Sequence, residues 1–151
     1  MSRPILALDL GTKTGWAYSR HGLIRSNTKM FTPRKKDHPA YRWVAFKTWL
    51  SEMLASYDIQ AVYYEQVRNH AGVRAGHCYG AFEALLEIAC YSRNCELIPV
   101  GVGTIKKFAT GKGNASKHEM MAAIDENVDL VDDNHADALH LLNYALSLEA
   151  D

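Results

Sequence analysis

Hydrophobic and polar positions change their spacing several times along the 151-residue chain. Short apolar runs with β-branched or aromatic residues predict strands, because such side chains fit the pleated, half-buried surface of a sheet. Apolar residues that recur every three or four positions predict helices with one buried face. These patterns predict strands at 4–9, 16–20, 23–31, 59–65 and 96–100, and helices at 40–57, about 73–92, about 117–127 and from near Asp132 onward.

Glycine, proline and polar residues mark the connections between these elements. We expect turns at 11–15 and 21–22, loops at 32–39 and 66–72, and a Gly- and Lys-rich connection at 101–115 with one helical turn at 104–108. Ser116 and Glu119 have the capping-box spacing that starts a helix at 117. The element order predicts an α/β fold with one mixed five-stranded sheet, three antiparallel strands followed by two more, and helices on both faces. No repeat or linker interrupts it, so we expect a single domain over 1–151.

Composition narrows the class of protein. The chain is 48% hydrophobic and 23% charged, which is typical of globular proteins. No apolar run approaches the roughly 18–20 residues that a membrane crossing needs, and the N-terminus does not resemble a signal peptide. We therefore expect a soluble, cytoplasmic protein with no membrane partner. Cys78, Cys90 and Cys95 form no C-x-x-C pair, which favours buried free thiols over disulfides or a zinc site.

The net charge of zero hides a strong asymmetry along the chain. All 17 Lys and Arg residues lie in 1–118 beside 8 acidic residues, whereas 119–151 holds the other 9 acidic residues. This distribution is typical of a protein that binds a polyanion and also needs a local cluster of carboxylates. A charged surface divided by chance is the alternative interpretation.

Acidic residues follow two of the predicted strands and begin the last helix. Asp9 ends the first strand, Glu65 ends the fourth, and Asp133 and Asp137 lie one turn apart on the final helix. If the first and fourth strands are neighbours, these carboxylates converge and need divalent cations to remain ionised together. Two Mg²⁺ ions about 4 Å apart hold the attacking and leaving oxygens of a phosphodiester in such sites. For each acid taken alone, a solvated strand end or a helix cap is the alternative.

Four segments resemble the RuvC-like Holliday-junction resolvases of the RNase H-like superfamily. Residues 5–17 (ILALDLGTKTGWA) are similar to the first strand and turn of that family, and 63–65 (YYE) to its second acidic motif. Residues 102–117 resemble its basic connector, and 133–139 (DNHADAL) resemble the start of its last helix. The segments occur in family order over 5–142, and they are closer to phage-type or divergent members than to the housekeeping bacterial enzyme.

The resemblance implies an RNase H-like fold and a Mg²⁺-dependent, homodimeric endonuclease that nicks opposed strands of four-way DNA junctions. Asp9, Glu65 and Asp137 would be metal ligands for two Mg²⁺ ions per site, with Mn²⁺ as a substitute. The small residues Ala75, Gly76 and Gly80 would let two helices approach in a dimer. Expected DNA contacts come from Lys13, Arg68, Arg74, Lys106, Lys107, Lys112 and Lys117.

Two positions depart from the family pattern. The family's third acid lies three residues before the fourth, but Asn134 occupies that position here. We expect Asp133 to supply the fourth carboxylate and Asp132 to cap the helix. The loop after Glu65 also lacks the aromatic residue that the family inserts into the junction centre, and it offers Arg68 and His70 instead.

Other functions remain as alternatives. The turn at 9–15 also resembles the phosphate-binding turn of actin-like ATPases and sugar kinases, but those proteins need a duplicated domain of about twice this length to close over ATP. A catalytically inactive DNA-binding relative is a second alternative, because Asn134 replaces an acid. An RNase H-fold nuclease that acts on RNA or on other branched DNA is a third.

Overall fold

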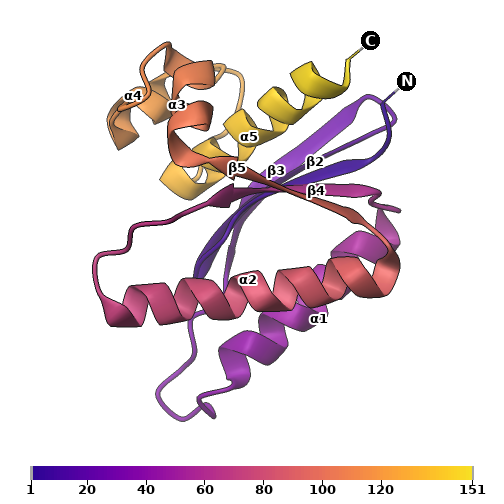
Figure 1. Cartoon of the computed structure of the whole chain (residues 1–151), viewed down its shortest axis with the longest axis vertical. Coiled ribbons are helices and arrows are strands. Elements are labelled where there is room, and N and C mark those ends of the chain that lie inside the picture. The colour runs from indigo at the N-terminus through magenta and orange to yellow at the C-terminus, as the bar shows by residue number, and fades with distance from the viewer. Residues whose placement is uncertain (1, 151) are drawn as a thin grey trace.

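The computed structural model of the chain describes residues 2–150 and contains the predicted alternation of strands and helices (Figure 1). No helix in this range has the length and apolarity that crossing a membrane requires. The elements are β1 (Ile5–Asp9), β2 (Lys13–Arg20), β3 (Leu23–Met30), α1 (Tyr41–Ser56), β4 (Ala61–Gln66), α2 (Val73–Arg93), β5 (Glu96–Gly101), α3 (Val102–Thr110), α4 (Lys117–Ala122) and α5 (Asp133–Glu149).

The five strands form one mixed sheet in the order β3-β2-β1-β4-β5. β1, β2 and β3 are an antiparallel meander, while β4 pairs parallel to β1, and β5 parallel to β4. The predicted sheet is therefore confirmed. Because β1 and β4 are parallel neighbours, their carboxyl ends lie at one edge of the sheet. Asp9 and Glu65 come one position after the paired residues Leu8 and Tyr64.

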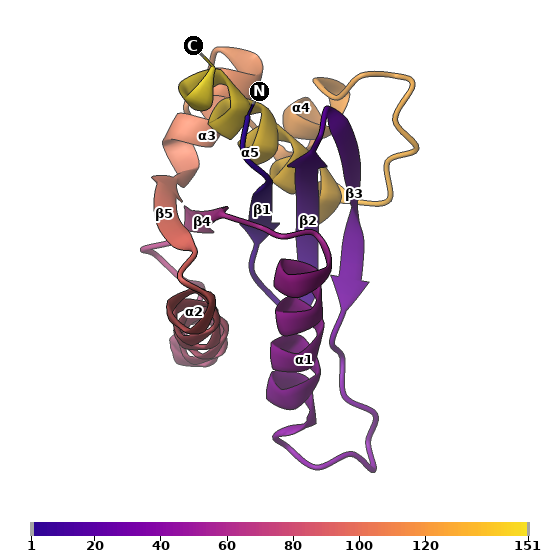
Figure 2. The same ribbon diagram turned by 90° about the vertical axis from the view of Figure 1, so that its right-hand side faces the viewer.

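Helices cover both faces of the sheet, as Figure 2 shows. On one face, Leu6 and Leu8 of β1 pack against the α1–α2 layer, where the rings of Phe46 and Phe82 meet edge to face at 4.8 Å. On the other face, Ile5 and its alternating neighbours pack against α3, α4 and α5. This alternation is the period-two pattern of a strand buried on both sides.

The three cysteines are free thiols. Cys90 is buried between α2 and the sheet, whereas Cys78 and Cys95 are partly buried. The prediction of free thiols is therefore confirmed, with full burial at Cys90 alone of the three.

β2 begins three residues earlier than predicted. The Thr14 hydroxyl donates to the Gly11 carbonyl at 2.6 Å, so the turn closes around Gly11 and Thr12 and strand pairing starts at Lys13. Gly15 is consequently a strand residue that pairs with Asp9, and its assignment to a turn was wrong.

The region between β5 and α5 also differs in the lengths of its helices. α3 spans nine residues where a single turn was expected; it buries Ile105 and ends at Gly111, which has φ of 85°. α4 has the predicted capping box of Ser116 and Glu119 but ends at Ala122, not near residue 127. There the Asp125 carboxylate accepts from the Asn127 backbone N–H at 2.8 Å, and this local bond competes with helix continuation.

The start of α5 rests directly on β2. A Cβ atom built on Gly15 would lie 1.9 Å from the Asn134 carbonyl oxygen, so a side chain at this position has no room. Since Gly15 pairs with Asp9, this close backbone contact places the first turn of α5 next to the end of β1.

We expect Gly15→Ala to lower the free energy of unfolding by about 2 kcal/mol or more, because an added methyl group must push α5 away from the sheet. Gly11→Ala is the matched control, since its Cβ would meet nothing nearer than 3.6 Å. Chemical denaturation of both variants measures the difference. Equal stabilities would show that α5 moves without cost.

Candidate active site

Asp9, Glu65 and Asp137 converge at the carboxyl end of β1 and β4. One carboxylate oxygen from each lies within 4.8 Å of the others, and all three side chains are partly buried. The parallel pairing of β1 with β4 brings the first two together, and α5 supplies the third from one turn inside its start. Three of the four predicted carboxylates are thus side by side; we call them the carboxylate trio.

Burial and mutual repulsion raise the pKa of every member of the trio. Burial raises the pKa of Asp9 well above its usual range, and the charges of Glu65 and Asp137 add to this effect. The pKa of Glu65 rises to about 7 through burial and then the Asp137 charge. The pKa of Asp137 rises to about 6 through burial and then the Asp133 charge. The nearby Lys106 ammonium opposes the last two shifts.

This donor set fits a hard divalent cation. Carboxylate oxygens are the ligands that Mg²⁺ and related ions prefer, and a dication replaces the missing positive charge. Lys106 lowers the pKa values of Glu65 and Asp137, and Lys117 lowers that of Asp137, yet both values stay raised, so the trio carries too little neutralising positive charge near neutral pH. Asp9, Glu65 and Asp137 are therefore the residues that would hold a metal ion.

Asp133 lies beside the trio but not within it. Its Oδ2 atom is 3.5 Å from the Lys117 ammonium, and its side chain is 30% exposed. Its charge nevertheless raises the pKa of Asp9 and Asp137, which places it within electrostatic reach of them. Its role as the fourth carboxylate stays a prediction.

Two residues fix the start of α5. The Asp132 carboxylate accepts from the His135 N–H at 2.9 Å and from the Thr28 hydroxyl at 2.6 Å, so the predicted helix cap is confirmed. The buried His135 ring accepts at Nδ1 from the Val131 N–H, which leaves Nε2 to donate to Ser26 Oγ at 2.7 Å. This role of His135 could not be predicted from sequence, because its partner on β3 is 109 positions away.

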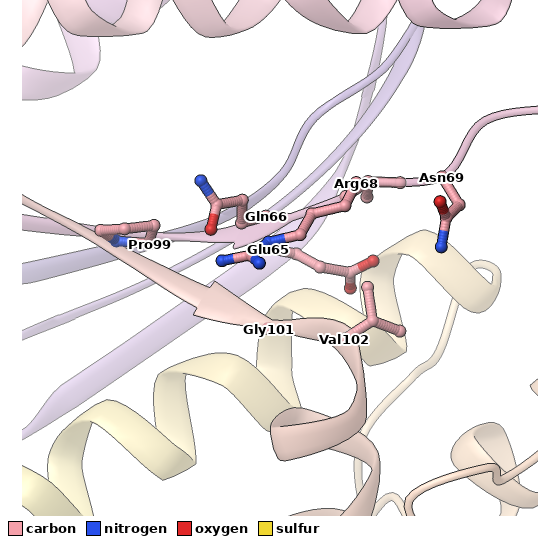
Figure 3. Close-up of a pocket in the computed structure, with 8 residues that line it drawn as sticks. Glu65, Gln66, Arg68, Asn69, Pro99, Gly101 and Val102 are labelled. Atoms are coloured by element: carbon pink, nitrogen blue, oxygen red, sulfur yellow. The ribbon is translucent and has the colours of Figure 1, made fainter.

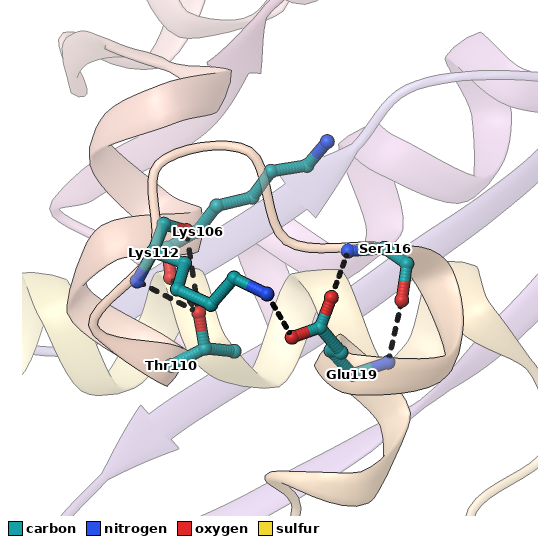
Figure 4. A network of polar contacts seen from close by, with 5 residues as sticks. All are labelled: Lys106, Thr110, Lys112, Ser116 and Glu119. Carbon is teal, nitrogen blue, oxygen red and sulfur yellow. Dashed lines mark hydrogen bonds and ion pairs between the residues drawn. The ribbon is translucent and has the colours of Figure 1, made fainter.

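Two members of the trio, Glu65 and Asp137, line a cleft of about 190 Å³ between α3, α4 and α5. Lys106 and Lys117 line it with Glu65 and Asp137, so cations and acids share its walls. Lys112 lies away from these walls: Figure 4 shows its ammonium against Glu119, at 2.7 Å, in the capped start of α4. Lys107 is exposed on α3.

A second and larger hollow, of about 780 Å³, shares Glu65 and Val102 with this cleft. Figure 3 shows Arg68 and Asn69, from the loop after β4, around it with Val102. Arg74 in the first turn of α2 and Lys13 at the start of β2 are also exposed. The predicted cations are thus spread over several elements around the trio.

His140 lies one turn beyond Asp137 on α5, and its ring contacts α4. The His140 ring is buried, and its Nε2 atom lies 2.7 Å from the Met120 carbonyl oxygen. It therefore joins α5 to α4.

No family model and no curated protein matches this sequence. Among solved structures, Thermus thermophilus RuvC in complex with a Holliday junction substrate superposes with a TM-score of 0.79 at 16% identity, over 98% of this chain and 96% of that one. The chain has the RuvC fold. A second T. thermophilus RuvC structure matches at 0.77 and 18% identity over 98% of each chain. The yeast mitochondrial Holliday junction resolvase Ydc2 matches at 0.64 and 13%, over 91% of this chain and 75% of that one.

The RuvC fold confirms the fold class expected from the four sequence segments. Identities of 13–18% carry the fold and leave individual roles to the local geometry. In that geometry the three converging acids come from β1, β4 and α5, which are the elements that the resemblance indicated.

We expect Mg²⁺ to raise the melting temperature more at pH 8 than at pH 5, by about 5 °C or more. Without metal, the raised pKa values of the trio stabilise the fold at low pH, and this contribution is lost as the pH rises through about 6 to 7. A dication binds the deprotonated acids, so its stabilisation grows over the same interval.

Thermal unfolding in EDTA and in Mg²⁺ across this pH range measures the effect. His135 and His140 also titrate with folding, but their contributions cancel in the difference between the two conditions. Glu65→Gln should reduce the pH dependence. A Mg²⁺ effect of the same size at pH 5 and pH 8 would contradict metal binding by the trio.

Proposed function

We propose that this protein is a structure-selective endonuclease that nicks opposed strands of four-way DNA junctions by hydrolysing phosphodiester bonds with two Mg²⁺ ions, for which Mn²⁺ substitutes. The observation that carries the proposal is the carboxylate trio beside a lysine-lined cleft on a RuvC fold. T. thermophilus RuvC and the fowlpox virus resolvase, the latter at a TM-score of 0.51 and 14% identity, are both in complex with Holliday junction DNA. A cytoplasmic location stays part of the proposal.

The chain's own residues divide the chemistry between them. Asp9, Glu65 and Asp137 would hold the metal, with Asp133 as the added ligand that a second ion needs. When bound, divalent ions supply an activated water and neutralise charge on the phosphate. Lys106 lies near Glu65 and Asp137, so its ammonium would meet the phosphate that enters the cleft. Val102, Ile105 and Met120 form the apolar part of the wall and limit water there.

DNA binding in this proposal exchanges ion pairs within the protein for contacts with phosphates. Lys117 leaves Asp133 and Lys112 leaves Glu119 as phosphates arrive, which also frees Asp133 to face the metal. Exposed cations need no such exchange, and we assign Lys13, Lys107, Arg68 and Arg74 to this group. Phosphate contacts of both kinds position the DNA without reading its sequence.

We also propose a homodimer, because two sites related by a two-fold axis match two opposed strands. The outward face of α2 supports it: Val73 and Tyr91 are 90% and 88% exposed, and the space around Gly80 is open. A Cβ atom built on Gly76 would instead lie 3.6 Å from the His70 ring of its own chain, so we place the proposed contact face at Gly80. Sedimentation of the junction complex gives the number of chains bound.

We expect Asp9→Asn and Glu65→Gln to slow junction cleavage in Mg²⁺ on the order of a hundredfold or more, because each removes a charged metal ligand. Junction affinity should stay within roughly threefold, since it comes from Lys and Arg contacts with phosphates. Glu52→Gln, an exposed acid on α1, is the control.

Cleavage of four-way junction, flap, duplex and RNA–DNA hybrid substrates is compared in the same assay. Wild-type protein that binds the junction but cleaves nothing would leave an inactive DNA-binding relative. Preference for the flap or the hybrid would overturn junction selectivity.

A separate comparison decides the fourth carboxylate. Asp133→Asn should slow cleavage on the order of a hundredfold, whereas Asn134→Ala and Asp132→Asn should each cost less than about tenfold. The physical reason is that Mg²⁺ gains more from a charged ligand, while asparagine at 132 still caps α5. Single-turnover cleavage rates measure all three variants. Loss in Asn134→Ala together with full activity in Asp133→Asn would reverse the assignment.

A further inference from the structure

A basic turn lies between β3 and α1, beyond the set of cations assigned above. It consists of Arg34, Lys35, Lys36 and Asp37, and Figures 1 and 2 show its loop extending past the end of the sheet. The Asp37 N–H donates to the Arg34 carbonyl at 2.9 Å and closes a β-turn. The Asp37 carboxylate accepts from the Arg34 N–H at 2.6 Å. The turn therefore has a defined shape that its own backbone maintains.

This basic turn directs its positive charge to solvent. The Arg34 side chain is 72% exposed, and its guanidinium forms an ion pair with the Asp37 carboxylate at 3.4 Å. Lys35 and Lys36 occupy the two central positions of the turn and are exposed, and within residues 2–150 neither forms an ion pair. Asp37 is held inward with a side chain only 10% exposed. The tip is thus a cationic surface with no neutralising acid at its two lysines.

The turn is connected to the carboxylate trio by short lengths of strand. Asp9 pairs with Gly15, which lies two residues after Lys13 at the start of β2, and Lys13 pairs with Met30 at the end of β3. The Phe31 N–H also donates to the Thr12 carbonyl at 2.7 Å, which ties the base of the loop to the turn after Asp9. Through the Thr12–Phe31 bond, with about 3.4 Å per residue and about 5 Å between strands, Lys35 lies at most about 30 Å from Asp9. One turn of a DNA duplex is about 34 Å long.

We propose that this basic turn contacts the phosphate backbone of a DNA arm whose junction end occupies the carboxylate site. The inference rests on the proposed function in taking DNA as the substrate, and it adds a contact remote from the chemistry. Lysine ammonium groups without protein partners meet phosphates and release counterions, which gives affinity without sequence preference.

The test compares two double variants of the full chain that each remove two positive charges. Lys35→Ala with Lys36→Ala changes the turn, and Arg25→Ala with Arg93→Ala removes exposed cations near the end of the sheet where β1 begins. Each is titrated with junctions whose arms are either about 20 or about 5 base pairs long, the short arms closed by hairpin loops, because 5 base pairs span only about 17 Å. Thermal unfolding verifies that both variants fold.

With long arms, the turn variant should bind on the order of tenfold more weakly, and the slope of log K against log salt should flatten by about 1.8. With short arms it should bind like the wild type, and the control variant should do so with both. An unchanged affinity and slope on long arms overturns the inference, and so does an equal loss on both arm lengths.

Cleavage by the wild type separates this inference from the proposed function. If the wild type cleaves the junction while the turn variant binds long arms normally, only the inference fails. If the wild type binds DNA without cleaving the junction, the proposed function fails, and long and short linear duplexes test the turn in the same way. If the wild type binds no DNA, the proposed function and the inference both fail. The remaining interpretation is then that the basic turn binds an acidic protein partner.

Discussion

Repulsion among three carboxylates held by packing is the constraint on which the candidate site depends. Asp9 and Glu65 are neighbours because β1 and β4 pair in parallel, and Asp137 joins them because Gly15 lets α5 rest on β2. None of these contacts involves the side chains of the acids. The fold therefore buries the acids close to one another, where their negative charges repel, and this raises their pKa values.

Two lysines near the trio form ion pairs with acids outside it, and bound DNA or metal would alter these pairs in the proposed function. Lys117 pairs with Asp133 and Lys112 pairs with Glu119, and the latter pair with the Ser116 cap lowers the pKa of Glu119 to about 2. Both pairs are exposed enough to be weak in water, so a phosphate competes with the acid for each lysine. The two ion pairs thus hold Lys117 and Lys112 in position, but weakly enough for a competing anion to displace the acids.

The sequence was sufficient to predict the sheet and the convergence of the acids, because strand ends and helix periodicity are local patterns. It was insufficient where the decisive contact is distant. Gly15 has no side chain that could contribute to a strand pattern. Glycine is required at this position because the carbonyl of Asn134, on α5, leaves no room for a side chain. The sequence pattern gives His135 no role beyond that of a helix residue, because its hydrogen bond to Ser26 forms only in the folded sheet. The end of α4 depends on whether Asp125 bonds the backbone or solvent, which composition does not decide.

Cations beside the carboxylate trio and cations far from it would respond differently to bound metal. Lys106 lies close enough to Glu65 and Asp137 to lower their pKa values, so in the absence of metal its field is largely taken up by these acids. A dication bound to the trio removes that demand, and the field of Lys106 is then available to a phosphate. In the proposed complex, cations without acidic neighbours, such as Lys35 and Lys36, would attract DNA whether or not metal is present. If both proposals hold, the DNA arms would bind before the active site does, and the scissile phosphate would enter last, where metal and lysine would act together.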